Sequence, residues 1–318
     1  MQELEARTKP HAPVILVATD LNDLDRLMPF ALREAAECNG RLILLHVLPA
    51  SRGMAIDPAG MPYYDPTSAL ESAGVALEPW CRTARKRNIA CDALVREGQA
   101  AEQISTSSRQ FLADRILLGT RSRSKLSKLL IGSVAEQVLR SVNLPVITVG
   151  PEAHLPVQSN TRERVVVLAT SFGETSRPSA ALACRIAASQ HAKLVLLHVL
   201  PPVIDKEHAA AGSELNSIAL VQLRTLAEQI GHADEGGTVI IEPLVAHGNP
   251  AIEILATASE LQASLIVLGS TQRSAFQNLT RDRIIYRVLA HARCPVLTLR
   301  EPSPSASAED VEQLAERF

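Results

Sequence analysis

Short, uninterrupted apolar runs alternate along the chain with longer segments in which apolar residues recur every three or four positions. Residues 14–19 (VILVAT) form the first run, and residues 25–38 (DRLMPFALREAAEC) follow with the spacing of an amphipathic helix. Continuous apolar runs are typical of strands that are buried on both faces of a parallel sheet. The same reasoning predicts strands at residues 41–48, 90–95, 115–118 and 146–149, and helices at residues 68–88, 100–112 and 133–141. This alternation predicts an α/β domain with right-handed crossovers.

The pattern occurs twice, because the second half of the chain repeats the first. The segment LLHVLP stands at residues 44–49 and again at residues 196–201, and VILVATD at 14–20 corresponds to VVVLATS at 165–171. A period of roughly 150 residues is too long for a solenoid unit and has the length of a whole domain. We therefore predict two tandem Rossmann-like domains, each an open, twisted, mostly parallel five-stranded sheet with helices on both faces.

The repeat also sets the predicted domain boundaries. The first domain is expected at residues 1–150, a polar linker at 151–163 and the second domain at 164–300. Residues 301–318 are expected to form a mobile tail that begins with the low-complexity segment EPSPSAS. The end of this tail, residues 308–318, is compatible with a short amphipathic helix or with a frayed terminus.

Composition narrows the classes of function. The chain has 318 residues, a formal net charge of −2 and 3% aromatic residues, so a basic surface for nucleic acid or anionic lipid is not expected. No apolar run approaches the about 20 residues of a membrane-spanning helix, and the N-terminal segment lacks the apolar core of a signal peptide. The five scattered cysteines lack CxxC spacing and are expected to be reduced core thiols, which indicates a cytoplasmic protein.

Several residues of the first repeat directly follow predicted strands, where ligands bind in open parallel sheets. Asp20 ends the first strand, and Gly119 ends the fourth strand before a loop with four basic residues (Arg121, Arg123, Lys125 and Lys128). The next helix opens at Gly132 and Ser133, and its free N–H groups and dipole favour phosphate. From these residues alone two interpretations stay open: an anion site, or a strand-end turn beside a solvated basic face. Asp20 likewise could bind a ligand or cap the following helix.

The whole chain resembles a tandem universal stress protein. The resemblance rests on the segments ATDLND and LLHVLP, on the turn that ends at Gly98, and on the stretch from Asp114 to Gly119 that leads to Gly132 and the segment LPV. The ATP-binding branch of that family uses a glycine, two residues, a second glycine, nine residues and then Gly-Ser or Gly-Thr. Gly119, Gly132 and Ser133 fall on that spacing, whereas Ser122 replaces the second glycine.

The resemblance implies that the first domain binds ATP or a related adenine nucleotide, with or without Mg²⁺, as a regulatory ligand. The implied site residues are Asp20 and the Val47 backbone for adenine, Gly119, Arg121 and Ser122 for the ribose and phosphates, Gly132, Ser133, Val134 and Ala135 for the phosphate tail, and Ala18, Thr19 and Leu118 for the wall. Because Ser122 lacks the conformational freedom of glycine, we expect weakened rather than abolished binding.

The second repeat lacks several of these residues. Ser171 stands in the place of Asp20, and Asp282 and Arg283 stand in the places of Gly132 and Ser133. An acidic side chain at the phosphate-capping turn would repel a triphosphate. We therefore predict that the second domain binds no ATP in the family manner and serves as a partner or regulatory half.

No catalytic residue is assigned. The chain has neither GxSxG nor HExxH, and its nine histidines lack metal-ligand spacing. ATP hydrolysis would need a further carboxylate for a metal, so any turnover is expected to be slow. His46 and His198 stand at equivalent strand ends and are either functional, as a ligand contact or a general base, or packed structural histidines; their presence in both repeats favours the structural interpretation.

Three functions therefore stay open: a nucleotide-regulated protein with an unknown protein partner, a nucleotide-independent interaction module, and a slow ATP hydrolase. The apolar fifth strands at residues 145–149 and 295–299 are candidate sheet edges, and exposed edges invite pairing. In the resembled family such strands join two domains, so here they could pair within one chain or join two chains into a homodimer. Contact with nucleic acid or a membrane is not expected.

Overall fold

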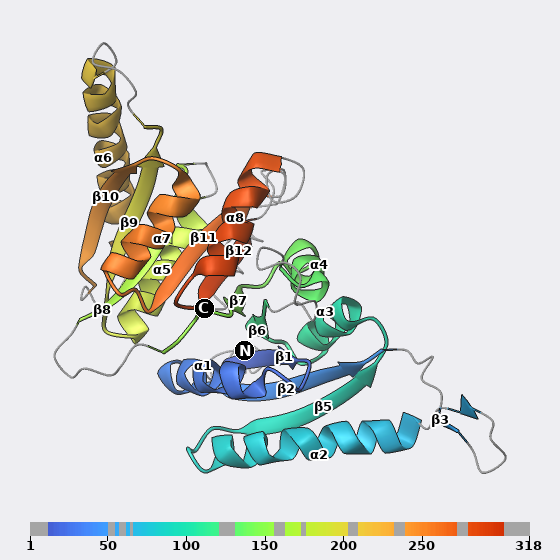
Figure 1. The fold of residues 1–318 in the computed structure, drawn as a ribbon. Coiled ribbons are helices and arrows are strands. Elements are labelled where there is room, and N and C mark those ends of the chain that lie inside the picture. The colour runs from blue at the N-terminus through green and yellow to red at the C-terminus, as the bar shows by residue number, and fades with distance from the viewer. Residues whose placement is uncertain are drawn as a thin grey trace, which may run out of the picture. The chain divides into compact units, whose positions relative to one another are not determined.

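The computed structural model describes residues 12–49, 55–56, 62–63, 66–120, 131–155, 163–172, 176–202, 209–231, 239–271 and 279–301. It divides into two compact units, residues 1–115 and residues 116–318 (Figure 1). The boundary falls within strand β6 (Arg115–Gly119), whereas the sequence repeat ends near residue 150. The second unit therefore contains the last strands of the first repeat together with the whole second repeat.

The first unit contains a parallel sheet in the order β1-β2-β5. Its strands are β1 (Val14–Thr19), β2 (Arg41–Leu48) and β5 (Cys91–Glu97), and its helices are α1 (Leu24–Glu37), α2 (Pro66–Arg85) and α3 (Ala100–Gln110). Two very short strands, β3 (Ala55–Ile56) and β4 (Pro62–Tyr63), pair antiparallel in the loop that follows β2. In Figure 1, α2 lies along β5.

The core of the first unit forms because apolar side chains recur at the periods of its elements. Strand β1 is buried along its whole length, as expected for a strand covered on both faces. Helix α1 buries an apolar stripe that includes Leu24, Leu27 and Ala31. Two charged side chains also lie in this interior: the Arg115 guanidinium forms an ion pair with Glu34. Since both are largely shielded from water, the pair must be satisfied internally.

The second unit contains a sheet in the order β10-β9-β8-β11-β12-β7-β6, in which every neighbouring pair is parallel except β12 and β7. Besides β6, its strands are β7 (Val146–Val149), β8 (Arg164–Ala169), β9 (Ala192–Leu200), β10 (Ile241–His247), β11 (Leu265–Thr271) and β12 (Val296–Glu301). Its helices are α4 (Ser133–Ser141), α5 (Ser176–Ser189), α6 (Ala209–Gly231), α7 (Pro250–Glu260) and α8 (Leu279–His291). Helices α7 and α8 pack together, as do α5 and α6.

The fifth strands of the two repeats pair with each other inside this unit. In the antiparallel register Ile147 lies opposite Leu297 and Thr148 lies opposite Val296. The buried Thr148 hydroxyl donates to the Val296 carbonyl oxygen at 3.0 Å. Of the two pairings expected from the sequence, the structure has the one within the chain. These strands are therefore not open edges, and a homodimer through them would require this pairing to open.

One glycine position is fixed by backbone conformation in both repeats. Gly98 and Gly248 follow β5 and β10 with φ angles of +136° and +146°, which side-chain-bearing residues rarely adopt. The Gly98 N–H donates to the carbonyl oxygen of Leu48 at the end of β2, at 2.9 Å. The Gly248 N–H donates in the same way to Leu200, the last residue of β9, at 2.9 Å. In each repeat this glycine therefore lies in the turn between a strand and the helix that follows it.

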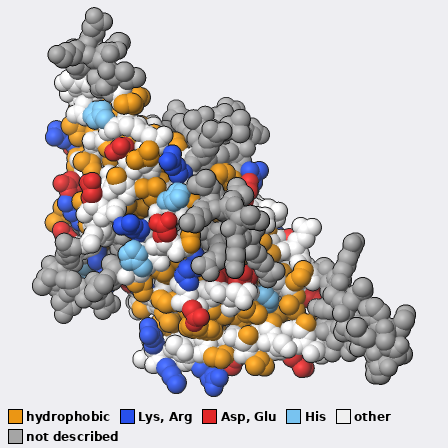
Figure 2. Space-filling model, viewed as in Figure 1, with side chains coloured by type: hydrophobic (Ala, Val, Ile, Leu, Met, Phe, Trp, Pro, Cys, Tyr) orange, Lys and Arg blue, Asp and Glu red, His pale blue; other side chains and the backbone are white. Residues whose placement is uncertain are grey.

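Charged side chains are distributed over the surface in agreement with the small net charge. Figure 2 shows acidic and basic side chains both spread over the visible face. Within the described ranges, no helix combines the length and the apolar character needed to cross a membrane. The predicted tail lies outside the described residues except for Glu301, which ends β12.

Candidate functional site

Thr19 organises the turn at the carboxyl end of β1. Its hydroxyl donates to Asp23 Oδ1 at 2.6 Å and accepts the N–H of Leu21 at 2.9 Å. Leu21 has a φ of 71°, a left-handed conformation that this side-chain hydrogen bond helps to hold. The second repeat has the same turn, because Phe172 has a φ of 59° and donates to the Thr170 hydroxyl at 3.3 Å. The threonine that recurs in both repeats is the sequence signal for this turn, whereas the family resemblance implies only a wall position for Thr19.

Asp20 does not cap the helix that follows it. The N-cap of α1 is Asp23, and Asp20 Oδ1 instead accepts the backbone N–H of Asn22 at 3.0 Å. The half-buried Asp20 comes directly after the Thr19–His46 pair of β1 and β2, so Val47 stands at the adjacent strand end. The first unit therefore brings together the two residues that the resemblance assigns to adenine.

The strand-end histidines are held by the same contact in both repeats. His46 Nδ1 lies 2.9 Å from the Thr19 carbonyl oxygen, and His198 Nδ1 lies 2.8 Å from the Thr170 carbonyl oxygen. His198 also stacks against Phe172, with 4.1 Å between the ring centroids. A contact that joins neighbouring strands in both repeats supports the interpretation of packed structural histidines and not that of a general base.

Asp23 carries a charge in a poorly solvated position. Burial raises the pKa of its carboxyl group above the usual value, although the hydrogen bond from Thr19 opposes this effect. Below the pKa of the unfolded chain, about 3.9, both states are protonated and the carboxyl group does not alter stability. As the pH rises, the unfolded state releases its proton first. Stability is therefore expected to fall until the pH passes the folded-state pKa.

Replacing Asp23 by asparagine should remove this pH dependence while keeping an oxygen for the Thr19 hydroxyl. We expect the variant to gain stability relative to the natural protein as the pH rises from 3 to 7. Urea unfolding at several pH values, followed by the fluorescence of Trp80 in α2, would measure it in the first unit. Asp25→Asn changes an exposed carboxylate in the same helical turn and is the matched control. A stability difference that stays constant with pH would contradict the expectation.

In the second unit, the end of β6 lies against the start of α4. Gly132 is the N-cap of α4 and donates its N–H to the Thr120 carbonyl oxygen at 3.2 Å. Leu118 is buried, Gly119 half-buried, and Ser133 and Val134 are exposed at the helix end. No side-chain cap is found here in the described part of the chain. The first-turn N–H groups and the helix dipole therefore favour an anion at this end.

The backbone of Gly132 does not itself require glycine. Its φ of −57° and ψ of 141° are accessible to any residue. What glycine provides is the absence of a side chain that would cap the helix. This leaves the end of α4 accessible, as the interpretation of Gly132 and Ser133 as a phosphate cap requires.

The second repeat contacts this helix. Tyr286 of α8 donates its hydroxyl to Glu136 Oε1 of α4 at 3.1 Å, and Arg140 forms an ion pair with the same carboxylate. Burial raises the pKa of Tyr286, so the phenol keeps its proton at neutral pH. The acidic charge in the first turn of α4 is thus shared between two partners, one of them from the second repeat.

Two predicted residues, Arg121 and Ser122, lie outside the described residues, together with the rest of the basic loop. The remaining predicted residues fall into two groups. Ala18, Thr19, Asp20 and Val47 belong to the first unit, and Leu118, Gly119, Gly132, Ser133, Val134 and Ala135 belong to the second.

One expectation about the second repeat needs correction. The repeated motif predicts Asp282 and Arg283 at a capping turn equivalent to that of Gly132 and Ser133. Helix α8 begins at Leu279, so both residues lie inside the helix and not at its N-cap. The helix starts earlier than its counterpart α4, and this shift of a helix end is not visible in the repeated motif. Ser171, in the place of Asp20, comes two residues after the end of β8 and is exposed.

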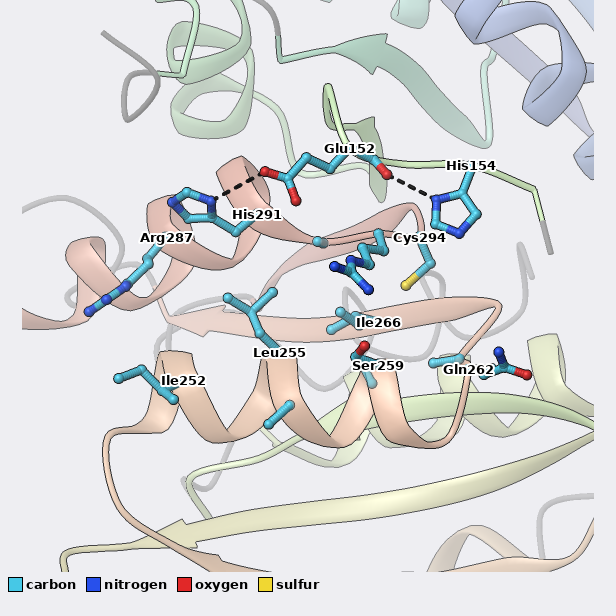
Figure 3. Close-up of a pocket in the computed structure, with 15 residues that line it drawn as sticks. Glu152, His154, Ile252, Leu255, Ser259, Gln262, Ile266, Arg287, His291 and Cys294 are labelled. Atoms are coloured by element: carbon cyan, nitrogen blue, oxygen red, sulfur yellow. Dashed lines mark hydrogen bonds and ion pairs between the residues drawn. The ribbon is translucent and has the colours of Figure 1, made fainter.

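A cavity of about 850 Å³ lies within the second unit, lined by α7, α8 and the start of the predicted linker (Figure 3). Glu152 Oε1 lies 3.7 Å from His291 Nδ1, and the Glu152 carbonyl oxygen lies 3.1 Å from His154 Nδ1. The first of these contacts holds the start of the linker against the last residue of α8, and the second lies within the linker. Burial raises the pKa of the lining thiol Cys294 to about 12, so it is not a nucleophile at neutral pH. None of the residues predicted for the nucleotide site lines this cavity.

Sequence reasoning missed this cavity because its walls come from distant segments of the chain. It joins residues near 152 with residues between 252 and 294. In the described residues, no group of three or more His, Cys, Asp or Glu is arranged to hold a metal ion.

The arrangement of both repeats matches known proteins. The model of the universal stress protein family matches residues 13–150 and again residues 163–300. A universal stress protein of Mycobacterium tuberculosis is 26% identical over 216 residues, which are 67% of this chain and 66% of that protein. The chain thus spans slightly less than two thirds of that relative. A universal stress protein of Mycolicibacterium smegmatis is 26% identical over 313 residues, 90% of this chain and 96% of that protein.

A solved structure supports the fold over nearly the whole chain. A universal stress protein from Archaeoglobus fulgidus superposes with a TM-score of 0.66 at 21% identity, covering 91% of this chain and 96% of that chain. The likeness at this identity concerns the fold, an α/β architecture of mostly parallel sheets. With the two matches of the family model, it leads to the conclusion that this chain belongs to the universal stress protein family and contains two family domains in tandem.

Proposed function

We propose that the first domain binds ATP or a related adenine nucleotide as a regulatory ligand, and that the second domain is a partner half that binds no ATP in this way. The observation that carries the proposal is the open N-terminus of α4. Gly132 leaves this helix end without a side-chain cap, directly beside the end of β6. A helix end of this kind is suited to the phosphate groups of a nucleotide.

Asp20 supports adenine as the base. Its carboxylate is half-buried, and only Oδ1 is occupied by the Asn22 N–H among the described contacts. A carboxylate accepts hydrogen bonds and does not donate them when ionised. The exocyclic amine of adenine is a donor, whereas guanine has a carbonyl acceptor at that position. Asp20 would therefore accept from adenine, and the Val47 backbone would supply the neighbouring contact.

The proposed regulatory role of the second domain is supported by the Tyr286–Glu136 hydrogen bond. It connects α8 to the same helix whose end would hold the phosphates. A nucleotide that prefers one position of α4 would shift the population of conformations in which this contact forms. A protein partner that binds only one of these conformations would then bind in response to the nucleotide. Mg²⁺, where present, would enter together with the phosphate groups.

Calorimetric titration of ATP with Mg²⁺ into the ligand-free protein tests this proposal. We expect a single site, and at least about tenfold weaker binding in Gly132→Asp, equivalent to about 1.4 kcal/mol. Aspartate is among the preferred N-cap residues, so the variant should remain folded while its carboxylate occupies the N–H groups and repels phosphate. Gly132→Asn is the matched control, because it caps the helix without the charge and should weaken binding less.

The outcomes separate the open functions. If the folded, ligand-free natural protein binds no adenine nucleotide, the proposal fails and a nucleotide-independent interaction module is the better account. Unchanged binding in Gly132→Asp would remove the phosphate-cap assignment. Magnesium-dependent phosphate release above background, lost in Gly132→Asp, would instead identify a slow ATP hydrolase.

A further inference from the structure

Two of the cysteines lie against each other in the interior of the first unit. Cys81 of α2 and Cys91, the first residue of β5, have their sulfur atoms 3.1 Å apart. Both side chains are buried, with exposed fractions of 0% and 2%. A disulfide has a bond length of about 2.0 Å, so the two sulfur atoms would have to approach by only about 1 Å.

The backbone on both sides of this pair is held in place. Helix α2 ends at Arg85, one turn after Cys81, and the chain reverses before β5. The Arg85 guanidinium reaches across this turn and donates to the Cys91 carbonyl oxygen from Nε at 3.0 Å and from Nη2 at 2.6 Å. This clamp keeps the start of β5 against the last turns of α2. The thiol contact is therefore part of the packing of α2 on β5. Figure 1 shows these two elements side by side.

The second repeat shows that the fold does not need sulfur at these positions. Leu42 of β2 pairs with Cys91, and the equivalent Leu194 of β9 pairs with Ile241. The helix that packs on this strand, α6, presents an aliphatic buried stripe of Ala219, Leu223, Leu226 and Ile230. The same core layer is thus filled by hydrocarbon in one repeat and by two adjacent thiols in the other. Packing alone does not account for the thiol pair.

The surroundings make the two thiols unequal. The Cys91 thiol donates its hydrogen bond to Cys81, which lowers the pKa of Cys81; burial opposes this, and the Arg85 charge adds to the lowering. The pKa of Cys91 is raised, first by the hydrogen bond with Cys81 and then by burial. Cys81 is therefore the thiol that ionises first and can act as the nucleophile, with Cys91 as the resolving thiol.

We propose that Cys81 and Cys91 form a reversible intramolecular disulfide when the protein meets a hydroperoxide such as hydrogen peroxide. The Cys81 thiolate attacks one peroxide oxygen, the O–O bond breaks, and the departing hydroxide takes up a proton to become water. Cys81 is then a sulfenic acid. The Cys91 sulfur attacks the Cys81 sulfur, the S–O bond breaks, and the hydroxide leaves as water with the Cys91 proton. Two electrons pass from the two sulfurs to the peroxide.

Because both thiols are buried, a peroxide reaches them only when this part of the unit opens locally. Cys81 lies near the end of α2, and β5 is the last strand of the sheet order. Helix ends and edge strands open locally without global unfolding. Cys91 is also at the amino end of β5, whereas Asp20 and Val47 lie at the carboxyl ends of parallel strands. The disulfide is thus independent of the proposed nucleotide site, and either proposal can fail alone.

Peptide mass spectrometry of the full-length protein tests the inference. The folded protein is treated with hydrogen peroxide, the remaining thiols are alkylated under denaturing conditions, and the peptides are identified with and without a dithiol reductant. We expect one cross-link, between Cys81 and Cys91, with the mass loss of two hydrogens and full reversal by the reductant. Cys38, Cys184 and Cys294 should remain alkylated, and the unfolding midpoint reported by Trp80 should rise on oxidation.

Variants separate the roles of the two thiols. In Cys91→Ser, Cys81 should accumulate as sulfenic or sulfinic acid, whereas in Cys81→Ser, Cys91 should remain a free thiol. Cys184→Ser, in the second repeat, is the matched control and should leave the cross-link unchanged. The cross-link measured in the natural protein tests the inference even if a variant fails to fold. Free alkylated Cys81 and Cys91 after peroxide treatment would overturn the inference, as would equal cross-linking among all five cysteines.

Discussion

Glu34→Ala is expected to lower the free energy of unfolding of the first unit by about 3–5 kcal/mol. The Glu34 and Arg115 side chains are only 14% and 9% exposed, and they form an ion pair. Removing the carboxylate leaves a guanidinium in the interior without its counter-charge. Burial lowers the pKa of Arg115, and Glu34 is the largest of the groups that raise it. The intrinsic basicity of the guanidinium keeps it charged even after Glu34 is removed. It cannot avoid the penalty by losing its proton.

The double variant Glu34→Leu with Arg115→Met separates charge from packing. Replacing a buried ion pair by apolar side chains of similar volume is often close to neutral. We therefore expect this variant to recover most of the stability that Glu34→Ala loses. Denaturant unfolding followed by Trp80, the single tryptophan, reports on the first unit. A loss of less than about 1 kcal/mol in Glu34→Ala would show that the pair behaves as a solvated surface pair.

Leu297→Ala is expected to destabilise the second unit by about 2–5 kcal/mol, the usual range for a truncated core leucine. Leu297 is 1% exposed and lies opposite Ile147 in the antiparallel pairing that joins the two repeats. The truncation removes apolar contacts at the junction and leaves a cavity in the buried layer on one face of the sheet. Chemical unfolding followed by far-ultraviolet circular dichroism measures the loss.

Ile252→Ala is the matched control for this prediction. Ile252 lies on α7 of the same unit but is 47% exposed, so its truncation should change stability by no more than about 0.5 kcal/mol. Equal effects of the two substitutions would mean that the β7–β12 pairing does not form a packed core. In that case the fifth strands would again be candidates for pairing between chains.

The apolar pattern predicts much of the secondary structure because burial of a strand or helix leaves a local periodic signal. The strands predicted at 41–48 and 146–149 and the helix predicted at 133–141 have the bounds that the structure shows. The strand predicted at 90–95 is found at Cys91–Glu97, since the polar residues after Val95 still belong to the ladder with β2. The repeated segments likewise indicate tandem domains and the family, because both are visible in the order of residues.

Contacts between segments that are far apart in the sequence became visible only in the tertiary structure. The antiparallel pairing of β7 with β12 joins residues about 150 positions apart. An apolar run indicates that a strand is a candidate sheet edge, but it does not identify the strand that pairs with it. The early start of α8 placed Asp282 inside a helix, and only packing reveals where a helix begins when no cap motif marks it.

The sequence by itself determined that this protein consists of two α/β repeats of the universal stress protein family, because hydrophobic periodicity and repeated motifs are local properties of the chain. Only the tertiary structure showed that the repeats join through their fifth strands, that Thr19 organises the first turn, and that Cys81 and Cys91 meet. The sulfur contact arises from the rotation of α2 about its axis and the register of β5. Both are set by the packing of the whole core, and neither is encoded in the spacing of two cysteines.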